Sequence, residues 1–127
     1  LAYKKGLLNS DIIKILKNNN INYQIVCDAA EPKSIAEINR AGFSVRKSNK
    51  NAPSNDKKVW QINWLQEWQQ NILKDSKNYI SEINNNCWDK DKNGMRINIP
   101  SPIDDHGMDA ARYACYTTVG SQVEFRV

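Results

Sequence analysis

An aspartate at position 28 is the first residue of this sequence at which chemistry is expected. Asp28 follows an alternating apolar run at 23–27 and precedes Pro32, with Ser34 and Glu37 spaced as at a helix start, which predicts a strand, a tight turn and a helix. Such strand ends hold ligands and metals in open α/β sheets, because their side chains project from a rigid element into a crevice. The alternative is that Asp28 only caps the following helix, since Asp is a favoured N-cap residue.

Three polar residues crowd the start of a second expected helix, near 104–116. Asp105 lies four residues before Asp109 and His106 three before it, so the three side chains share one side of the helix. Asp104 is the candidate N-cap. Two carboxylates one turn apart repel each other by a few tenths of a kcal/mol unless a cation lies between them, and a divalent metal would explain that cost.

Together, the two groups would form an oxygen-rich metal site. Asp28, Asp105 and Asp109 supply hard oxygen ligands, which suit Mg²⁺ or Mn²⁺ much better than zinc. Two such ions about 4 Å apart can activate a water and stabilise the leaving oxygen in phosphodiester hydrolysis. His106 is the single histidine of the chain, which excludes a multi-histidine cluster. It is a candidate ligand, orienting group or proton carrier, or a plain polar residue at a helix start.

The segment 46–58 is polar and basic and lacks apolar periodicity, which predicts a loop. Its basic side chains could contact DNA phosphates, although a charge run is usually only a solvated surface. The residues concerned are Arg46, Lys47, Lys50, Lys57 and Lys58.

Strand and helix signals alternate in the first part of the chain. A helix capped by Asn9 or Ser10 is expected before the first strand, and a helix at 32–41, ended by Gly42, leads into a short strand at 43–46. Strand, helix and strand in this spacing predict a right-handed parallel unit and therefore an α/β fold class.

The middle of the chain carries an aromatic stripe. Trp60, Trp64 and Trp68 recur every four residues, which predicts a helix that packs on the sheet, although aromatic rings can also stack on bases. Residues 70–74 are a candidate strand, and Asn78 is a candidate cap for the next helix.

The segment 89–94 matches the first half of a calcium-binding EF-hand loop. The twelfth position of that loop is Pro100, which cannot supply the bidentate carboxylate. A hairpin turn at 91–94 between two short strands is therefore expected instead.

Size and composition indicate one domain. The chain has 127 residues, a net charge of +4 and a pI near 9.0, which mildly favours an anionic partner. Its three cysteines are widely spaced, so they predict neither a disulfide framework nor a zinc knuckle. No apolar run approaches the roughly 20 residues of a membrane span, and we expect a cytoplasmic protein that does not contact a membrane.

Two stretches carry a family resemblance. The segments 27–38 (CDAAEPKSIAEI) and 103–113 (IDDHGMDAARY) resemble the nuclease domain of the large terminase subunit of tailed bacteriophages. Between them, the segment 64–66, the helix around Glu82 and the segment 87–94 look like the middle section of that family. The resemblance covers nearly the whole chain, from about Asn9 to Tyr116, and makes all of 1–127 part of one nuclease domain.

The resemblance implies a ribonuclease H-like fold, a mixed sheet flanked by helices, and a Mg²⁺- or Mn²⁺-dependent endonuclease that cuts concatemeric double-stranded DNA during viral packaging. Asp28 matches the family's acid at a strand end, Asp109 its acid on the last helix and His106 the histidine one turn before. Glu31 and Asp105 lie beside matched positions. The implied partners are DNA, the terminase small subunit and the portal, in the cytoplasm of the host cell.

The family's first catalytic aspartate lies on an opening strand that this sequence does not contain, and no Gly-rich phosphate loop of a packaging ATPase occurs. We therefore expect a partial nuclease domain, with impaired two-metal catalysis and an unpaired sheet edge that favours self-association. Two alternatives stay open: a fragment that contacts DNA or the portal without cutting, and another ribonuclease H-like nuclease such as a junction resolvase.

Overall fold

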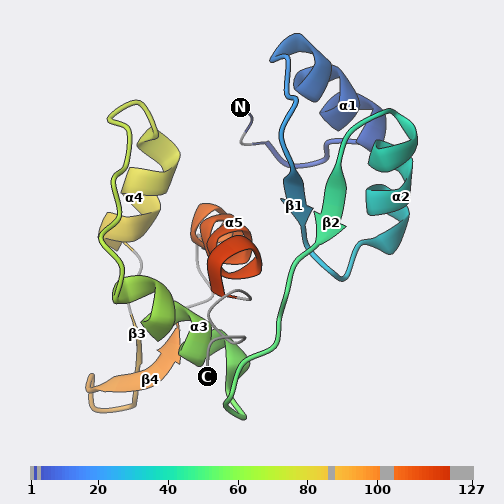
Figure 1. Ribbon diagram of the computed structural model, residues 1–127. Helices are drawn as coiled ribbons and strands as arrows, with labels where there is room; N and C mark the ends of the chain where they lie inside the picture. The colour runs from blue at the N-terminus through green and yellow to red at the C-terminus, as the bar shows by residue number, and fades with distance from the viewer. Residues whose placement is uncertain (1, 3, 86–87, 101–104, 121–127) are drawn as a thin grey trace. The chain divides into compact units, whose positions relative to one another are not determined.

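A computed structural model describes residues 2, 4–85, 88–100 and 105–120 and divides the chain into two units (Figure 1). The first unit is Leu1–Asn49 and the second is Lys50–Val127. Each unit is described by itself below.

The first unit consists of two helices and two parallel strands. Its elements are α1 (Asn9–Asn18), β1 (Ile25–Cys27), α2 (Pro32–Arg40) and β2 (Val45–Lys47). β1 and β2 pair in parallel, with Ile25 opposite Val45. Leu16, Ile38 and Val45 form the buried core between the helices and the strands. The strand, helix and parallel strand confirm the predicted α/β class.

The ends of the two helices follow local chemistry. Gly42 has a φ of +99°, which confirms the predicted left-handed turn after α2. The predicted cap of α1 was wrong, because the helix already begins at Asn9 and Leu8 is its N-cap. The backbone N–H of Leu8 donates to the carboxylate of Asp11 at 3.0 Å, so an acid inside the first turn satisfies the N–H of the N-cap residue, as the third helical residue of a capping box does.

One edge of the small sheet is covered by a side chain. Asn39 donates to the carbonyl of Val45 at 3.0 Å and accepts from its N–H at 2.9 Å, so its amide takes the place of a neighbouring strand. On β1, the alternation of a parallel ladder directs the backbone of Val26 away from β2. Among the described residues no strand pairs with that second edge of β1, and self-association through it stays a prediction.

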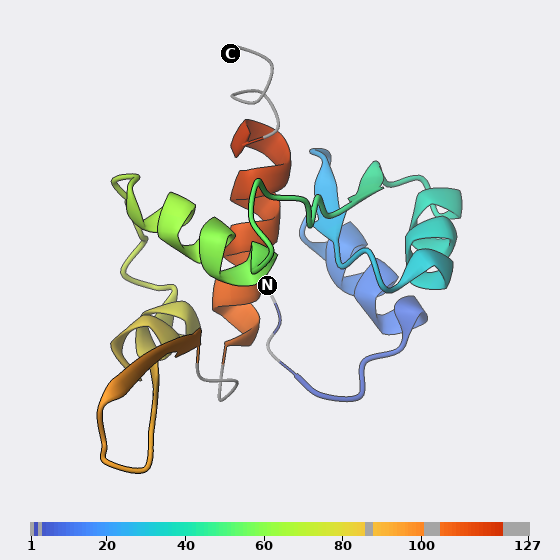
Figure 2. The same ribbon diagram turned by 90° about the horizontal axis from the view of Figure 1, so that it is seen from below.

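The second unit is built from helices and one hairpin. Its elements are α3 (Lys57–Gln66), α4 (Lys77–Asn85), β3 (Trp88–Lys90), β4 (Arg96–Pro100), α5 (His106–Cys115) and a π-helical turn η1 (Tyr116–Gly120). β3 and β4 pair in antiparallel fashion. η1 continues α5 without a break, as Figure 2 shows.

The hairpin turn is held by Asp91. Its carboxylate accepts the N–H groups of Asn93 at 2.8 Å and Met95 at 3.0 Å, and Gly94 has a φ of +77°. These bonds confirm the hairpin turn that the sequence predicted at 91–94. The strand predicted at 70–74 was wrong. These residues form neither a helix nor a strand. Asn78 was also wrongly expected as a cap, since α4 already begins at Lys77.

The tryptophan stripe of α3 packs against the end of the last helix. Tyr116 is completely buried, and its ring meets the rings of Trp60 at 5.8 Å and Trp64 at 5.2 Å edge to face. Trp68, at the end of the stripe, is 49% exposed. The stripe was expected to pack on a sheet, but the strands of this unit form only a two-stranded hairpin, and α3 packs against α5 as well as β4.

No helix among the described residues is long and apolar enough to span a membrane. Cys27 and Cys115 are free thiols, and Cys87 lies outside the described residues. Burial raises the pKa of both described thiols, and the nearby charge of Asp28 raises the pKa of Cys27 further.

We predict that Tyr116→Ala lowers the free energy of unfolding of the second unit by about 3–5 kcal/mol, because it removes the ring on which two tryptophans pack. All four tryptophans of the chain lie in this unit, so the loss is measured by tryptophan fluorescence in urea. Trp68→Ala, at the half-exposed end of the stripe, is the control and should cost much less. Equal losses in the two variants would contradict the packing described.

Candidate metal centre

Asp28 follows β1 directly, as the sequence predicted. Its side chain accepts the N–H of Ala30 at 3.0 Å and its carbonyl accepts the N–H of Glu31 at 3.1 Å, which closes a tight turn. The N-cap of α2 is Glu31, so Asp28 shapes the turn and does not cap the helix.

Ser48 ties this turn to the end of β2. Its N–H donates to the carbonyl of Cys27 at 2.7 Å, and its hydroxyl accepts the N–H of Ala29 at 3.1 Å. Ser48 itself is buried. The backbone on both sides of Asp28 is therefore fixed, and the carboxylate is held on a rigid part of the first unit.

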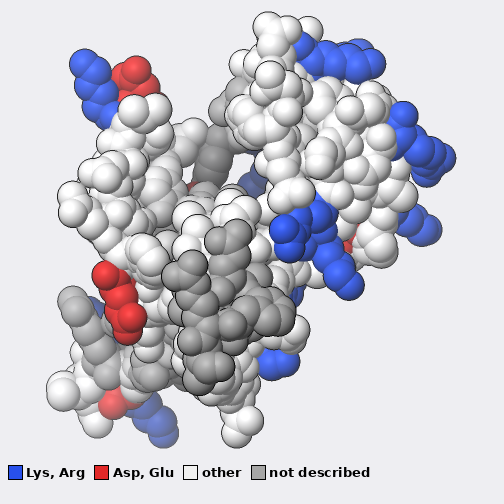
Figure 3. Space-filling view, viewed as in Figure 1, with Lys and Arg blue, Asp and Glu red and all other residues white. Residues whose placement is uncertain are grey.

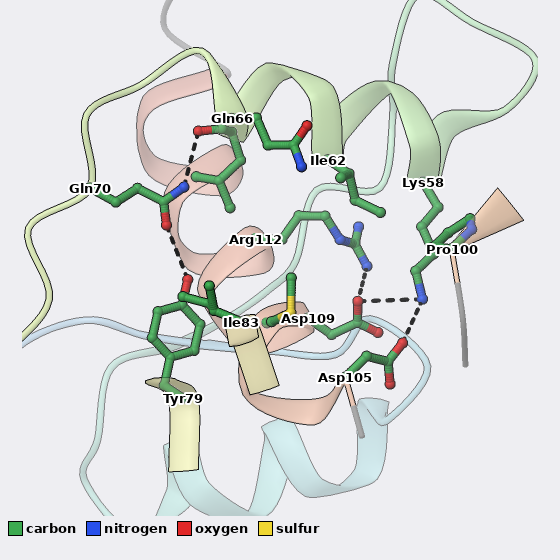
Figure 4. Close-up of a pocket in the computed structure, with 12 residues that line it drawn as sticks. Lys58, Ile62, Gln66, Gln70, Tyr79, Ile83, Pro100, Asp105, Asp109 and Arg112 are labelled. Atoms are coloured by element: carbon green, nitrogen blue, oxygen red, sulfur yellow. Dashed lines mark hydrogen bonds and ion pairs between the residues drawn. The ribbon is translucent and has the colours of Figure 1, made fainter. Parts of the chain in front are cut away.

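In the second unit, two acids converge on one cation. The ammonium group of Lys58 lies 2.9 Å from Oδ2 of Asp105 and 3.5 Å from Oδ1 of Asp109 (Figure 4). Asp105 is the N-cap of α5, and Asp109 lies one turn later. The helix was expected to be capped by Asp104, which lies outside the described residues. The repulsion expected between the two carboxylates is relieved here by a lysine from α3.

The surroundings of Lys58 keep its ammonium charged. Burial by itself would lower the pKa of Lys58, but the hydrogen bond to Asp105 and the charges of Asp109 and Asp105 outweigh burial and the repulsion from Arg112, so the pKa is raised. Because the pKa of Lys58 is raised in the folded state, the contribution of its protonation to stability is fully present at the ordinary lysine pKa and is lost only as the pH rises through the raised value. Near neutral pH the two acids therefore face a full positive charge.

A second cation, Arg112, holds Asp109 from inside the unit. Its Nη2 donates to Oδ1 of Asp109 at 2.9 Å, and its Nη1 donates to the side chain of Gln61 at 2.7 Å. The guanidinium also lies over the ring of Tyr113 at 4.5 Å. Its Nε is buried and finds no partner within the described part of the chain. The Arg112 guanidinium, which also contacts Gln61 and Tyr113, thus orients the Asp109 carboxylate.

The first turn of α5 is fixed by Glu82 of α4. The carboxylate of Glu82, which is 4% exposed, accepts the N–H of Met108 at 2.9 Å. A negative charge at a helix N-terminus is favourable, because the first N–H groups lack intrahelical partners. A Cβ on Gly107 would come within 2.9 Å of the same carboxylate, so the contact requires glycine at this position.

A cavity of about 150 Å³ lies beside the acids. Its wall includes the acid pair, Arg112 and the apolar side chains of Ile62 and Ile83. Sites for drug-sized ligands span roughly 300–1,000 Å³, so this space is too small to enclose a nucleotide.

The donor set suits a hard divalent cation but is incomplete. Two carboxylates already point at one positive charge, and Lys58 marks the place where a cation would lie. No group of three or more His, Cys, Asp or Glu within the described ranges is placed to hold a metal. His106 is the first residue of α5 and is exposed. A metal at this place would need further ligands beyond the acids of α5.

Lysine and arginine side chains project from the surface that Figure 3 shows. The basic residues predicted to contact DNA differ in exposure and in their contacts. Lys47 and Lys57 are exposed, whereas Arg46 donates to Gln24 at 3.4 Å and Lys50 lies over the ring of Tyr113 at 5.2 Å. Lys58 is bound to the acids, which local sequence patterns gave no reason to expect.

Sequence reasoning missed three residues that support the site. Arg112 could have been found, because it follows Asp109 by three residues on the expected helix. Gln61 and Glu82 reach α5 from 51 and 26 residues away in sequence, and only the fold brings them there.

Comparisons with known proteins agree with this picture. A family model described as the terminase RNase H-like domain matches residues 2–116. Among solved structures, the nuclease domain of g2p, the large terminase of bacteriophage SPP1 with bound Mn, is similar with a TM-score of 0.76 at 24% identity. The match covers 90% of this chain and 66% of that chain, and it shows a shared fold. A comparison with curated proteins gives no match.

We predict that Glu82→Ala destabilises the second unit by about 1–2 kcal/mol and speeds amide hydrogen exchange at Met108, because the first turn of α5 loses its acceptor. Exchange is followed by mass spectrometry or NMR. Glu67→Ala, an exposed acid at the end of α3, is the control and should change neither quantity. Unchanged exchange at Met108 would show that Glu82 does not hold the helix start.

Proposed function

Because the chain belongs to the family of terminase RNase H-like domains, we propose that it acts as a metal-dependent DNA endonuclease of a viral DNA-packaging terminase. The family match and the structural likeness confirm the ribonuclease H-like fold that the sequence resemblance implied. The proposed reaction is hydrolysis of phosphodiester bonds in concatemeric double-stranded DNA.

The observation that carries this proposal is the convergence of Asp105 and Asp109 on a single cation. Carboxylates arranged in this way are the ligands that Mg²⁺ and Mn²⁺ prefer. The similar terminase nuclease domain of SPP1 contains bound Mn, which supports a divalent ion in this family's fold.

We assign the following roles to the residues of this chain. Asp28, Asp109 and Asp105 provide oxygen ligands, and Arg112 keeps the Asp109 carboxylate oriented. His106 carries a proton or orients a ligand at the exposed start of α5. The divalent ions would supply a nucleophilic hydroxide and stabilise the leaving oxygen.

This chain spans 66% of the length of the similar SPP1 nuclease domain. The family resemblance implies a further aspartate on an opening strand outside this sequence, and we propose that it completes the ligand set. We further propose double-stranded DNA, the terminase small subunit and the portal as partners, and the host cytoplasm as the place of action.

A second candidate function is DNA or portal contact without cutting. It is favoured by the finding that Lys58 and Arg112 already neutralise the acids of α5 and that no third metal-binding side chain joins them in the described part of the chain. In that case the basic side chains would supply affinity, and the acids would only stabilise the fold.

We predict that the chain cuts supercoiled plasmid in the presence of Mn²⁺ and that Asp28→Asn and Asp109→Asn each reduce cutting at least 100-fold, because each removes a proposed metal ligand. Plasmid nicking is followed by gel electrophoresis. Asp75→Asn, at an exposed position, is the matched control and should cut like the parent. Cutting that persists unchanged in either variant would contradict these roles. A folded parent that binds DNA without cutting it would mean that the chain needs the further aspartate or only contacts DNA.

DNA affinity tests the basic residues separately. Lys47→Ala and Lys57→Ala should each weaken DNA binding to a similar extent for all sequences and lower the slope of log affinity against log salt by about 1, because each removes one phosphate contact. Binding is measured by fluorescence anisotropy at several salt concentrations. Lys14→Ala, on an exposed position of α1, is the control, and an equal effect there would mean that no particular basic site contacts DNA.

A further inference from the structure

The two cations that hold the acids of α5 differ sharply in burial. The side chain of Arg112 is 6% exposed, whereas that of Lys58 is 40% exposed. Both contact the same oxygen, Oδ1 of Asp109, at 2.9 Å and 3.5 Å respectively. They therefore approach Asp109 from two environments, one enclosed and one open to solvent.

Arg112 is built into the unit. Besides Asp109 it engages Gln61 of α3 and lies over the ring of Tyr113. If the guanidinium moved away, the buried side-chain oxygen of Gln61 and the partly buried carboxylate of Asp109 would each lose a hydrogen-bond donor. Such a loss is costly in free energy. Arg112 is thus expected to stay on Asp109 whatever else binds.

Lys58 is held differently. Its ammonium is a compact charge on a flexible stem, and within the described part of the chain its recorded partners are the two carboxylates. Because the stem is partly exposed, the ammonium can swing into solvent and be hydrated there without leaving a cavity. The Lys58 side chain is far more exposed than that of Arg112, so exchanging Lys58 for another cation is opposed less than exchanging Arg112 would be.

A divalent ion and the Lys58 ammonium cannot occupy the same place. An ion bound by Asp105 and Asp109 would lie where the ammonium now lies, and two positive charges at that distance repel each other strongly. Metal binding at the acids of α5 therefore requires that Lys58 move away. The position of the Lys58 side chain therefore depends on whether a divalent ion is bound.

We propose that Lys58 is a positioning residue that holds Asp105 and Asp109 together as an internal counter-ion and is displaced when a divalent ion binds. This inference rests on the proposed function, because it takes the acids of α5 to be metal ligands. Lys58 keeps the carboxylates converged in the absence of metal and competes with the metal for them. Once displaced, its ammonium is available to a phosphate group.

The first test is Mn²⁺ binding by the whole chain, measured by isothermal titration calorimetry. Lys58→Met should bind Mn²⁺ about fivefold more tightly than the parent, because it removes a positive charge that competes for the two carboxylates. Lys58→Arg should bind like the parent or more weakly. Lys74→Met, at another exposed lysine of the second unit, is the control and should leave the affinity within about twofold.

The second test uses the unaltered chain and so does not depend on the folding of a variant. Acetylation of lysine amines by a dilute acylating reagent is followed by mass spectrometry with and without Mg²⁺. Mg²⁺ should speed the acetylation of Lys58 severalfold, because the displaced ammonium is freed from its carboxylates, and should leave Lys57 unchanged.

The outcomes separate this inference from the proposed function. Mn²⁺ binding that is equal or weaker in Lys58→Met, together with Lys58 acetylation that does not respond to Mg²⁺, would overturn the role of Lys58 while leaving the metal site standing. Failure of the parent and of every variant to bind Mn²⁺ would overturn the metal site itself and the inference with it.

Discussion

The second unit depends on the neutralisation of two like charges. Asp105 and Asp109 lie one turn apart on α5, and Lys58 of α3 approaches both. Without that cation the two acids would keep Arg112 as a counter-charge on Asp109 alone, at the place where Glu82 adds a further negative charge from α4. The contacts between α3, α4 and α5 thus bring cations and helix N–H groups to the carboxylates. The packing of Tyr116 on the tryptophans of α3 holds the same helices together at the other end of α5.

In the first unit, hydrogen bonds to the backbone of the turn after β1 fix the position of Asp28. The turn after β1 is closed by Asp28 and tied to β2 through Ser48, so that one acidic side chain stands at the end of a short parallel sheet. The sheet itself is small, and Asn39 covers one of its edges. The placement of an acid at a strand end is the arrangement on which the metal chemistry proposed for this family relies.

Local patterns in the sequence predicted most of the elements, because capping, turn and periodicity signals act over a few residues. The helix ended by Gly42 and the turn at Asp91 are examples. The failures have the same physical origin. A strand was expected at 70–74 from composition alone. The contact of Lys58 with the acid pair was not foreseen, since nothing near Asp105 in the sequence shows that Lys58 reaches it from 47 residues away. Long-range pairing of charges is decided by the fold, and local periodicity does not contain it.

The central claim is that Asp28 and the acids of α5 are ligands of divalent metal ions. Paramagnetic broadening of backbone amide resonances by substoichiometric Mn²⁺ tests it directly, since Mn²⁺ broadens only the resonances of nearby residues. The account predicts that the resonances of Asp28 and its turn broaden and that those of Asp105–Asp109 broaden as well. Broadening confined to one of these two segments, or absent from both, would contradict it.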